Sequence, residues 1–184
     1  MPIPSALTVY HLFPVAAAME TTETGMREYR SAEFVDVAIK DRKLHGYAAV
    51  FDMPWDERAT ESAGYVEELR RGLFRKALPR SGDIPLLWQH DRNQLLARTG
   101  SGSLVLEEDG KRLRVEAELP KSGLGEYVRE LIDRGDVRGM SYGRVAASGD
   151  QRIEKRNGIW HRVIHDARKI LDVTLTWEPT YPDA

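Results

Sequence analysis

An alternation of apolar and polar residues between positions 104 and 119 is the strongest constraint on the fold. Leu104 and Leu106 are spaced two apart in its first half. The second half repeats this spacing at four apolar positions, namely Leu113, Val115, Ala117 and Leu119. A period of two places one face of a strand in the core and the other in water. Because Asp109-Gly110 separates the halves, the sequence predicts an antiparallel hairpin with one buried face.

Further strands are expected on both sides of this hairpin. The apolar run Leu44–Phe51 predicts a buried strand, and Tyr65–Leu69 predicts a short one. Ile84–Trp88 is another candidate, in which Pro85 must lie near the strand start because it cannot donate a ladder hydrogen bond. Three more strands are predicted towards the C-terminus, over residues 139–147, 159–164 and 170–177.

Few helices are expected beside these strands. Apolar residues follow helical spacing between Ser122 and Arg134, with Ser122 as the predicted N-cap and Gly135 as the stop. A turn or two of helix is predicted over Leu73–Leu78, ending before Pro79. The sequence therefore predicts an α+β fold, a mostly antiparallel β-barrel or sheet flanked by a few helices.

Length and composition narrow the classes of protein. The 184 residues suffice for one domain, expected over residues 26–184 after a flexible leader over residues 1–25. A net charge of -2 gives no general attraction to nucleic acid or to an anionic membrane. No apolar run approaches the roughly 20 residues of a membrane span. The lack of cysteine excludes disulfides, thiolate metal ligands and a cysteine nucleophile.

Ser141, in Gly139-Met140-Ser141-Tyr142-Gly143, is the candidate nucleophile. A hydroxyl held rigidly on a strand can attack a substrate carbonyl when a base lies beside it. The motif opens a strand after a helix, which excludes the strand-to-helix elbow of α/β-hydrolases. The alternative is an ordinary strand serine between small residues.

His90 is the candidate general base, and Asp172 is the candidate for orienting its ring. The alternatives are a loop histidine paired with Asp91, and an Asp172 that faces water together with Thr174. His161 and His165 have a spacing known from zinc sites on helices, but they fall in or directly after a predicted strand and no glutamate follows the first histidine. No metal and no cofactor are therefore expected.

Taken in order, these segments resemble the tailed-bacteriophage prohead (procapsid) maturation protease family over residues 44–184. The resemblance rests on the ordered set LHGYAAVFD, PLLWQHD, RGDVRGMSYG and ILDVTLTWEPTYPDA. It implies a serine endopeptidase whose fold is similar to that of the herpesvirus assembly proteases. It further implies His90 and Ser141 as base and nucleophile, with Asp172 as the third member. Because the herpesvirus enzymes use a second histidine there, His165, and after it His161, are alternatives.

The resemblance also implies the setting. The expected substrates are the scaffolding segment of the major capsid protein, the portal and other procapsid proteins, and the protease itself. A second copy of the chain is a further candidate partner. Cleavage would take place in the host bacterial cytoplasm, inside the assembling procapsid.

Two departures from the family pattern motivate a second hypothesis, an inactive assembly or scaffold-binding domain of the same fold. Arg144 stands where the family commonly has an aromatic residue, and Asp172-Val173-Thr174 stands where it usually has Glu-Val-Ser. An unrelated β-barrel binding module is a third hypothesis. For the oxyanion of an enzyme, backbone N–H groups and Arg144 are both candidate donors.

Overall fold

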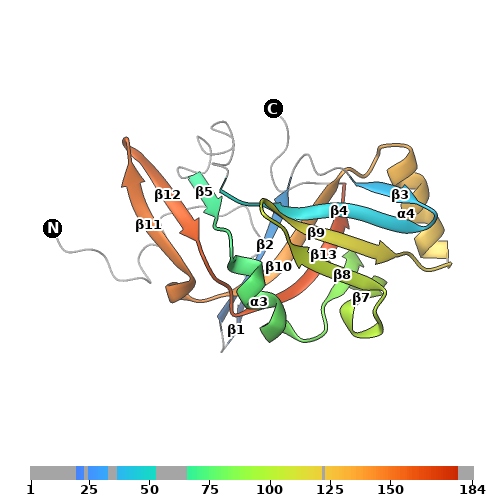
Figure 1. Cartoon of the computed structure of the whole chain (residues 1–184), viewed down its shortest axis with the longest axis horizontal. Helices are drawn as coiled ribbons and strands as arrows, with labels where there is room; N and C mark the ends of the chain where they lie inside the picture. Colours follow the sequence, from blue (N-terminus) through green and yellow to red (C-terminus); the bar gives the residue numbers. More distant parts are fainter. Residues whose placement is uncertain (1–19, 23–24, 33–36, 53–65, 122, 178–184) are drawn as a thin grey trace.

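The computed structural model describes residues 20–22, 25–32, 37–52, 66–121 and 123–177, and Figure 1 shows its three open sheets. The six-stranded sheet has the order β1 (Glu20–Thr22), β2 (Gly25–Ala32), β10 (Gly139–Ala146), β13 (Lys169–Thr176), β6 (Pro85–Trp88) and β7 (Asp91–Arg98). The four-stranded sheet has the order β3 (Ala38–Lys40), β4 (Lys43–Val50), β9 (Arg112–Glu118) and β8 (Leu104–Glu108). The three-stranded sheet has the order β11 (Gln151–Arg156), β12 (Ile159–Ile164) and β5 (Val66–Leu69).

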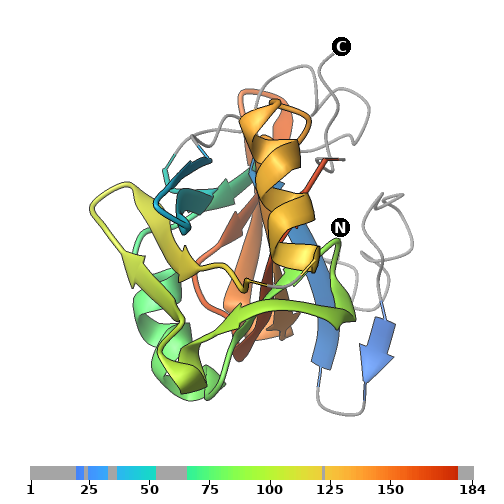
Figure 2. The same cartoon turned by 90° about the vertical axis from the view of Figure 1, so that its right-hand side faces the viewer.

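Two α-helices accompany these sheets in the described residues, α3 (Leu73–Ser81) and α4 (Gly123–Asp133). The α+β prediction is therefore confirmed, but the sheets do not close into a barrel. In Figure 1 the hairpin of β11 and β12 extends at one end of the molecule and α4 lies at the other. Figure 2 turns the α4 end towards the viewer.

The alternating hairpin is confirmed in the register that its apolar positions require. Leu104 faces Ala117 and Leu106 faces Val115 across β8 and β9. At the turn, the Asp109 carboxylate accepts the backbone N–H groups of Lys111 and Arg112, each at 2.7 Å. Period two thus determines both the pairing and the buried face.

The main core lies between the six-stranded and four-stranded sheets. It includes Leu44, Val115 and Ala117 from one sheet and Met140, Tyr142, Val173 and Leu175 from the other. The ring of Phe74 on α3 meets that of Tyr142 edge-on, with centroids 4.9 Å apart. Such contacts stabilise the strands that carry the candidate site.

Helix α3 differs from the prediction, because it continues through Pro79 to Ser81. Proline has no N–H to donate to the carbonyl of Arg75, so the helix continues for two more residues without that bond. The Ser81 hydroxyl donates to the carbonyl of Ala77 at 2.7 Å and accepts the N–H of Ile170 at 2.8 Å. This hydroxyl therefore ties the end of the helix to β13.

Some of the predicted features lie outside the described residues. Gly135 ends α4 with a φ of 79°, as expected, whereas the predicted N-cap Ser122 lies outside the described residues, as do residues 1–19 of the expected leader. The remaining part of that leader includes β1, which pairs with β2. Strand β11 was not predicted, although Asn157-Gly158 after it is a strong hairpin signal.

Candidate active site

The pairing of β10 with β13 brings Ser141 and Asp172 onto one face of the six-stranded sheet. Ser141 is the register partner of Thr174, and Gly143 is the partner of Asp172. Cross-strand partners share a face and side chains alternate between faces. The opposite face presents Met140, Tyr142, Val173 and Leu175 to the core. The strand geometry alone therefore separates the candidate site from the core.

A β-bulge adjusts this face at Asp172. Gly143 pairs with Asp172 but Arg144 pairs with Ile170, so Leu171 is an extra residue on β13. In a regular strand Ile170 and Asp172 would share a face. The extra residue instead lets Ile170 join the core while Asp172 points to the side of Ser141.

His90 reaches the same face from a neighbouring strand. Strand β6 runs parallel to β13, with Leu87 beside Thr174, and it ends in a two-residue turn between Trp88 and Asp91. The two turn residues, Gln89 and His90, have φ values of 56° and 57°. Positive φ at both central positions is what a type I′ hairpin turn requires.

The imidazole of His90 lies between the other two side chains. Its Nδ1 is 2.6 Å from Asp172 Oδ1, and its Nε2 is 2.9 Å from Ser141 Oγ. A carboxylate only accepts hydrogen bonds, so Nδ1 of the neutral ring carries the proton and Nε2 accepts from the serine hydroxyl. Ser141 is 1% exposed, whereas the His90 side chain keeps 25% of its surface in solvent.

This arrangement is suited to proton transfer from a hydroxyl. Nε2 can take the proton of Ser141 as Oγ attacks an electrophile, and the Asp172 carboxylate can stabilise the imidazolium that forms. Both distances lie within the reach of about 2.6–3.2 Å that proton transfer between side chains requires. Of the residues named from sequence, the structure thus brings Ser141, His90 and Asp172 together.

Two alternative placements are wrong, and a third is less favoured. Asp172 and Thr174 do not face water, because they are 5% and 0% exposed. The Asp91 carboxylate accepts the N–H of Asn93 at 2.8 Å, while the carboxylate at Nδ1 of His90 belongs to Asp172. The alternation of β10 places Arg144 on the core face, where Nη1 donates to the carbonyl of Asp166 at 3.3 Å. This placement favours backbone N–H groups over Arg144 as oxyanion donors.

The two other candidate histidines lie elsewhere. His165 follows β12, and its backbone N–H donates to the carbonyl of Asp150 at 3.0 Å. His161 lies on β12, where Nδ1 is 2.8 Å from Oε1 of Glu68 on β5. The pair at Glu68 belongs to the three-stranded sheet rather than to the face of Ser141.

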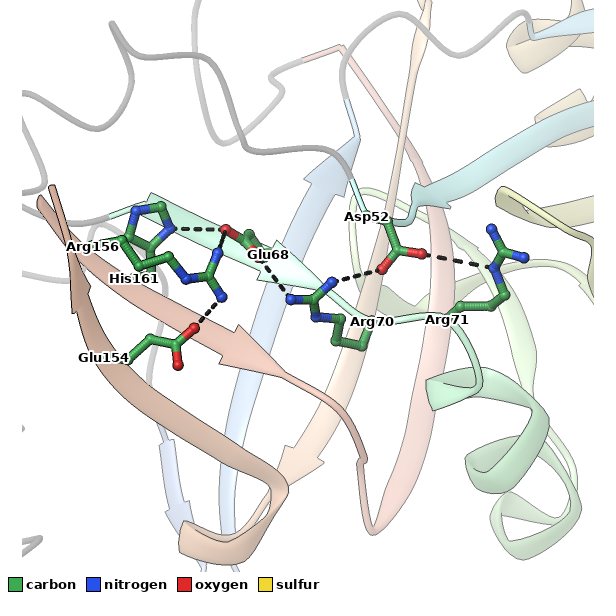
Figure 3. Close-up of polar contacts among 7 residues, drawn as sticks. All are labelled: Asp52, Glu68, Arg70, Arg71, Glu154, Arg156 and His161. Carbon is green, nitrogen blue, oxygen red and sulfur yellow. Dashed lines mark hydrogen bonds and ion pairs between the residues drawn. The ribbon is translucent and has the colours of Figure 1, made fainter.

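Arginines surround Glu68, as Figure 3 shows. Nη1 of Arg156 donates to Glu68 Oε1 at 2.7 Å, and Nη2 of Arg70 lies 3.5 Å from Oε2. Arg156 also pairs with Glu154. Burial by itself would raise the pKa of Glu68, but the hydrogen bonds from His161 and Arg156 outweigh it and lower the pKa below its ordinary value. The cluster joins β5 to the β11–β12 hairpin.

Two negative findings hold for the part of the chain that the structure describes. There, no group of three or more histidine, aspartate or glutamate side chains is arranged to hold a metal ion. Nor does any helix within those residues have the length and apolar character to cross a membrane.

Comparison with protein-family models gives a match over most of the chain. The model of a family described as caudovirus prohead serine protease matches residues 28–184. No curated protein and no solved structure matches the chain.

Proposed function

The chain belongs to the caudovirus prohead serine protease family, and from this premise we propose that it is an endopeptidase with Ser141 as nucleophile, His90 as general base and Asp172 as the residue that orients His90. The observation that carries the proposal is the imidazole of His90, which lies 2.9 Å from Ser141 Oγ and 2.6 Å from Asp172 Oδ1. Nucleophile, base and orienting group are recognised by this geometry and not by their order in the chain.

The proposed reaction proceeds in two halves. Ser141 Oγ attacks the scissile carbonyl while its proton moves to His90 Nε2, and the imidazolium then protonates the leaving amine to give an acyl-enzyme. Water next attacks the acyl carbon, gives its proton to Nε2, and releases the carboxylic acid as Ser141 regains its proton. Asp172 stabilises the imidazolium in both halves, and backbone N–H groups are the expected donors to the oxyanion.

We propose that the substrates are the scaffolding segment of the major capsid protein, the portal and other procapsid components, and the protease itself. The family description supports a role in prohead maturation. Confinement inside a procapsid of the host cytoplasm would supply a high local concentration, so that weak substrate binding suffices. A likeness in fold to the herpesvirus assembly proteases is part of the same proposal.

The inactive assembly domain is less well supported by the geometry. An assembly domain needs no hydroxyl, imidazole and carboxylate in hydrogen-bonded succession, yet all three are present and partly or fully buried. The shorter Asp172 in place of the family's glutamate reaches His90 Nδ1 at 2.6 Å. The departure from the family pattern therefore does not prevent the contact.

Co-expression with the major capsid protein of the same phage tests the proposal. Ser141→Ala is expected to abolish processing of the capsid protein, as seen by intact-mass spectrometry, because the proposed acyl-enzyme forms on Ser141 Oγ. Ser101→Ala is the matched control, since this serine lies exposed after β7 and is expected to leave processing unchanged. Processing by the Ser141→Ala chain would rule out the assignment. Peptide cleavage is a better readout than a fluorophosphonate label because Ser141 is 1% exposed in the free chain.

A further inference from the structure

The turn that carries His90 is built from residues that do not favour its backbone conformation. Gln89 and His90 have φ values of 56° and 57°. The β11–β12 hairpin uses a turn of the same kind, but there the residues are Asn157 and Gly158, which adopt positive φ readily. For residues such as glutamine and histidine the left-handed region costs about 1 kcal/mol or more, so contacts from outside the turn must hold it.

Thr174 supplies two of those contacts through one hydroxyl. Its Oγ1 accepts the backbone N–H of His90 at 2.9 Å and donates to the backbone carbonyl of Leu87 at 2.9 Å. The residue is 0% exposed, so water does not compete for these groups. The N–H of Gln89 adds a bond to the carbonyl of Leu175 at 3.1 Å. The end of β6 and the start of the turn are thereby fixed to β13.

The position of Thr174 on β13 links this turn to the nucleophile. Thr174 is the antiparallel register partner of Ser141 and the parallel partner of Leu87. Asp172 lies two residues before Thr174 on β13 and points to the same face of the sheet as Ser141. Thr174 therefore bonds the backbone of His90 from a position beside Ser141 and on the same strand as Asp172.

We propose that Thr174 is a positioning residue, whose hydroxyl holds the His90 turn so that Nε2 faces Ser141 Oγ and Nδ1 faces Asp172. The inference rests on the proposed function and deepens it. A serine can make the same two hydrogen bonds, whereas a valine of similar shape leaves the His90 N–H and the Leu87 carbonyl without this partner.

Steady-state cleavage of a peptide that spans a capsid processing site tests the inference. Thr174→Val is expected to lower kcat about 10- to 100-fold with KM within about twofold, because a misplaced base slows the chemical step more than binding. Thr174→Ser is expected to keep kcat within about threefold of the wild-type value.

Ser81→Ala is the matched control for stability. Its hydroxyl is also buried and also bridges two backbone groups, the Ala77 carbonyl and the Ile170 N–H of β13, but it lies away from the His90 turn. The unfolding temperatures of Thr174→Val and Ser81→Ala are expected to fall by similar amounts, while Ser81→Ala keeps the kcat of the wild-type protein. An equal loss of kcat in both variants would show a merely structural role for Thr174 and overturn the inference.

A readout without turnover separates this inference from the proposed function. The ¹⁵N chemical shifts of the His90 ring, assigned by comparison with His90→Asn, report which nitrogen carries the proton. The Nδ1–H form is expected in the wild-type, Thr174→Ser and Ser81→Ala proteins, and a mixture of forms in Thr174→Val. Unchanged shifts in Thr174→Val would overturn the positioning role, whereas only processing by Ser141→Ala would overturn the proposed protease.

Discussion

The candidate active site and the cluster at Glu68 both contain a histidine whose Nδ1 contacts a carboxylate. The distance is 2.6 Å from His90 to Asp172 and 2.8 Å from His161 to Glu68. Both carboxylates are buried, with 7% and 8% of their side-chain surface exposed. By the pair alone, the two regions are almost the same.

Their surroundings distinguish them. Around Glu68, Arg156 and Arg70 add positive charge, so the cluster is a cross-link between β5 and the β11–β12 hairpin. At the other region, Nε2 of His90 faces the hydroxyl of Ser141. A histidine–carboxylate pair therefore does not identify a catalytic site until the group at the second ring nitrogen is known.

Exchanging each histidine should give the largest difference between the two regions. His90→Asn is expected to lower kcat by at least about 10³-fold, because the proposed general base is lost while asparagine still tolerates positive φ in the turn. His161→Gln is expected to keep kcat within about threefold and to lower the unfolding temperature. Peptide cleavage by both variants measures kcat, and thermal unfolding measures their stability. An equally inactive His161→Gln protein would show that the two histidines do not differ in their importance for catalysis.

Replacing the two carboxylates should also affect kcat unequally, but the difference should be smaller than for the two histidines. Asp172→Asn is expected to lower kcat about 10²- to 10⁴-fold, because an amide can stabilise the wrong tautomer of His90 and cannot stabilise the imidazolium. Glu68→Gln is expected to leave kcat unchanged. His165→Ala serves as the third arm of the kinetic assay. A greater loss of kcat in His165→Ala than in Asp172→Asn would make His165 the third member.

The smallest expected effect is the pH dependence of stability at Glu68. Since its pKa is lowered in the folded chain, ionised Glu68 stabilises the fold fully above its ordinary value of 4.5, and this stabilisation is lost as the pH falls through the lowered pKa. Glu68→Gln is therefore expected to cost about 2 kcal/mol of unfolding free energy at pH 7 and progressively less below about pH 4.5.

Urea unfolding at several pH values measures this difference. Glu130→Gln is the control, since its side chain is 67% exposed and pairs with Arg134 only at 3.7 Å. This control is expected to change stability by less than about 0.5 kcal/mol at every pH. A Glu68→Gln effect that persists unchanged at pH 3 would show that the cluster acts by packing and not by charge.

Local pattern was sufficient for several of the strands. The hairpin of β8 and β9 follows from period two and Asp109-Gly110, and β10 follows from the run after Gly139. Strand β11 escaped prediction because its residues, QRIEKR, show no alternation. Its charged side chains serve the cluster at Glu68 instead of a hydrophobic core. Asn157-Gly158 was the signal that could have revealed this hairpin.

The three residues of the candidate site could be named from sequence, but their arrangement could not be derived from it. Asp172 fits a water-facing position on an alternating strand equally well until the bulge at Leu171 and the burial of that face are known. The contact between His90 and Asp172 depends on the parallel pairing of β6 with β13, which no local pattern encodes. The bonds of Thr174 depend on the same pairing.

The central place of β13 also has a consequence for the timing of synthesis. His90 is 51 residues from Ser141 and 82 residues from Asp172, and β13 is the last strand described. A chain leaves the ribosome N-terminus first, at about 5–20 residues per second. His90 and Ser141 therefore emerge before the strand that lies between them in the finished sheet, and long-range pairing of this kind forms slowly. A nascent chain, or one cut short before β13, has the proposed nucleophile and base but lacks the strand that lies between them, so the proposed activity is expected only after synthesis of the strand that carries Asp172 and Thr174.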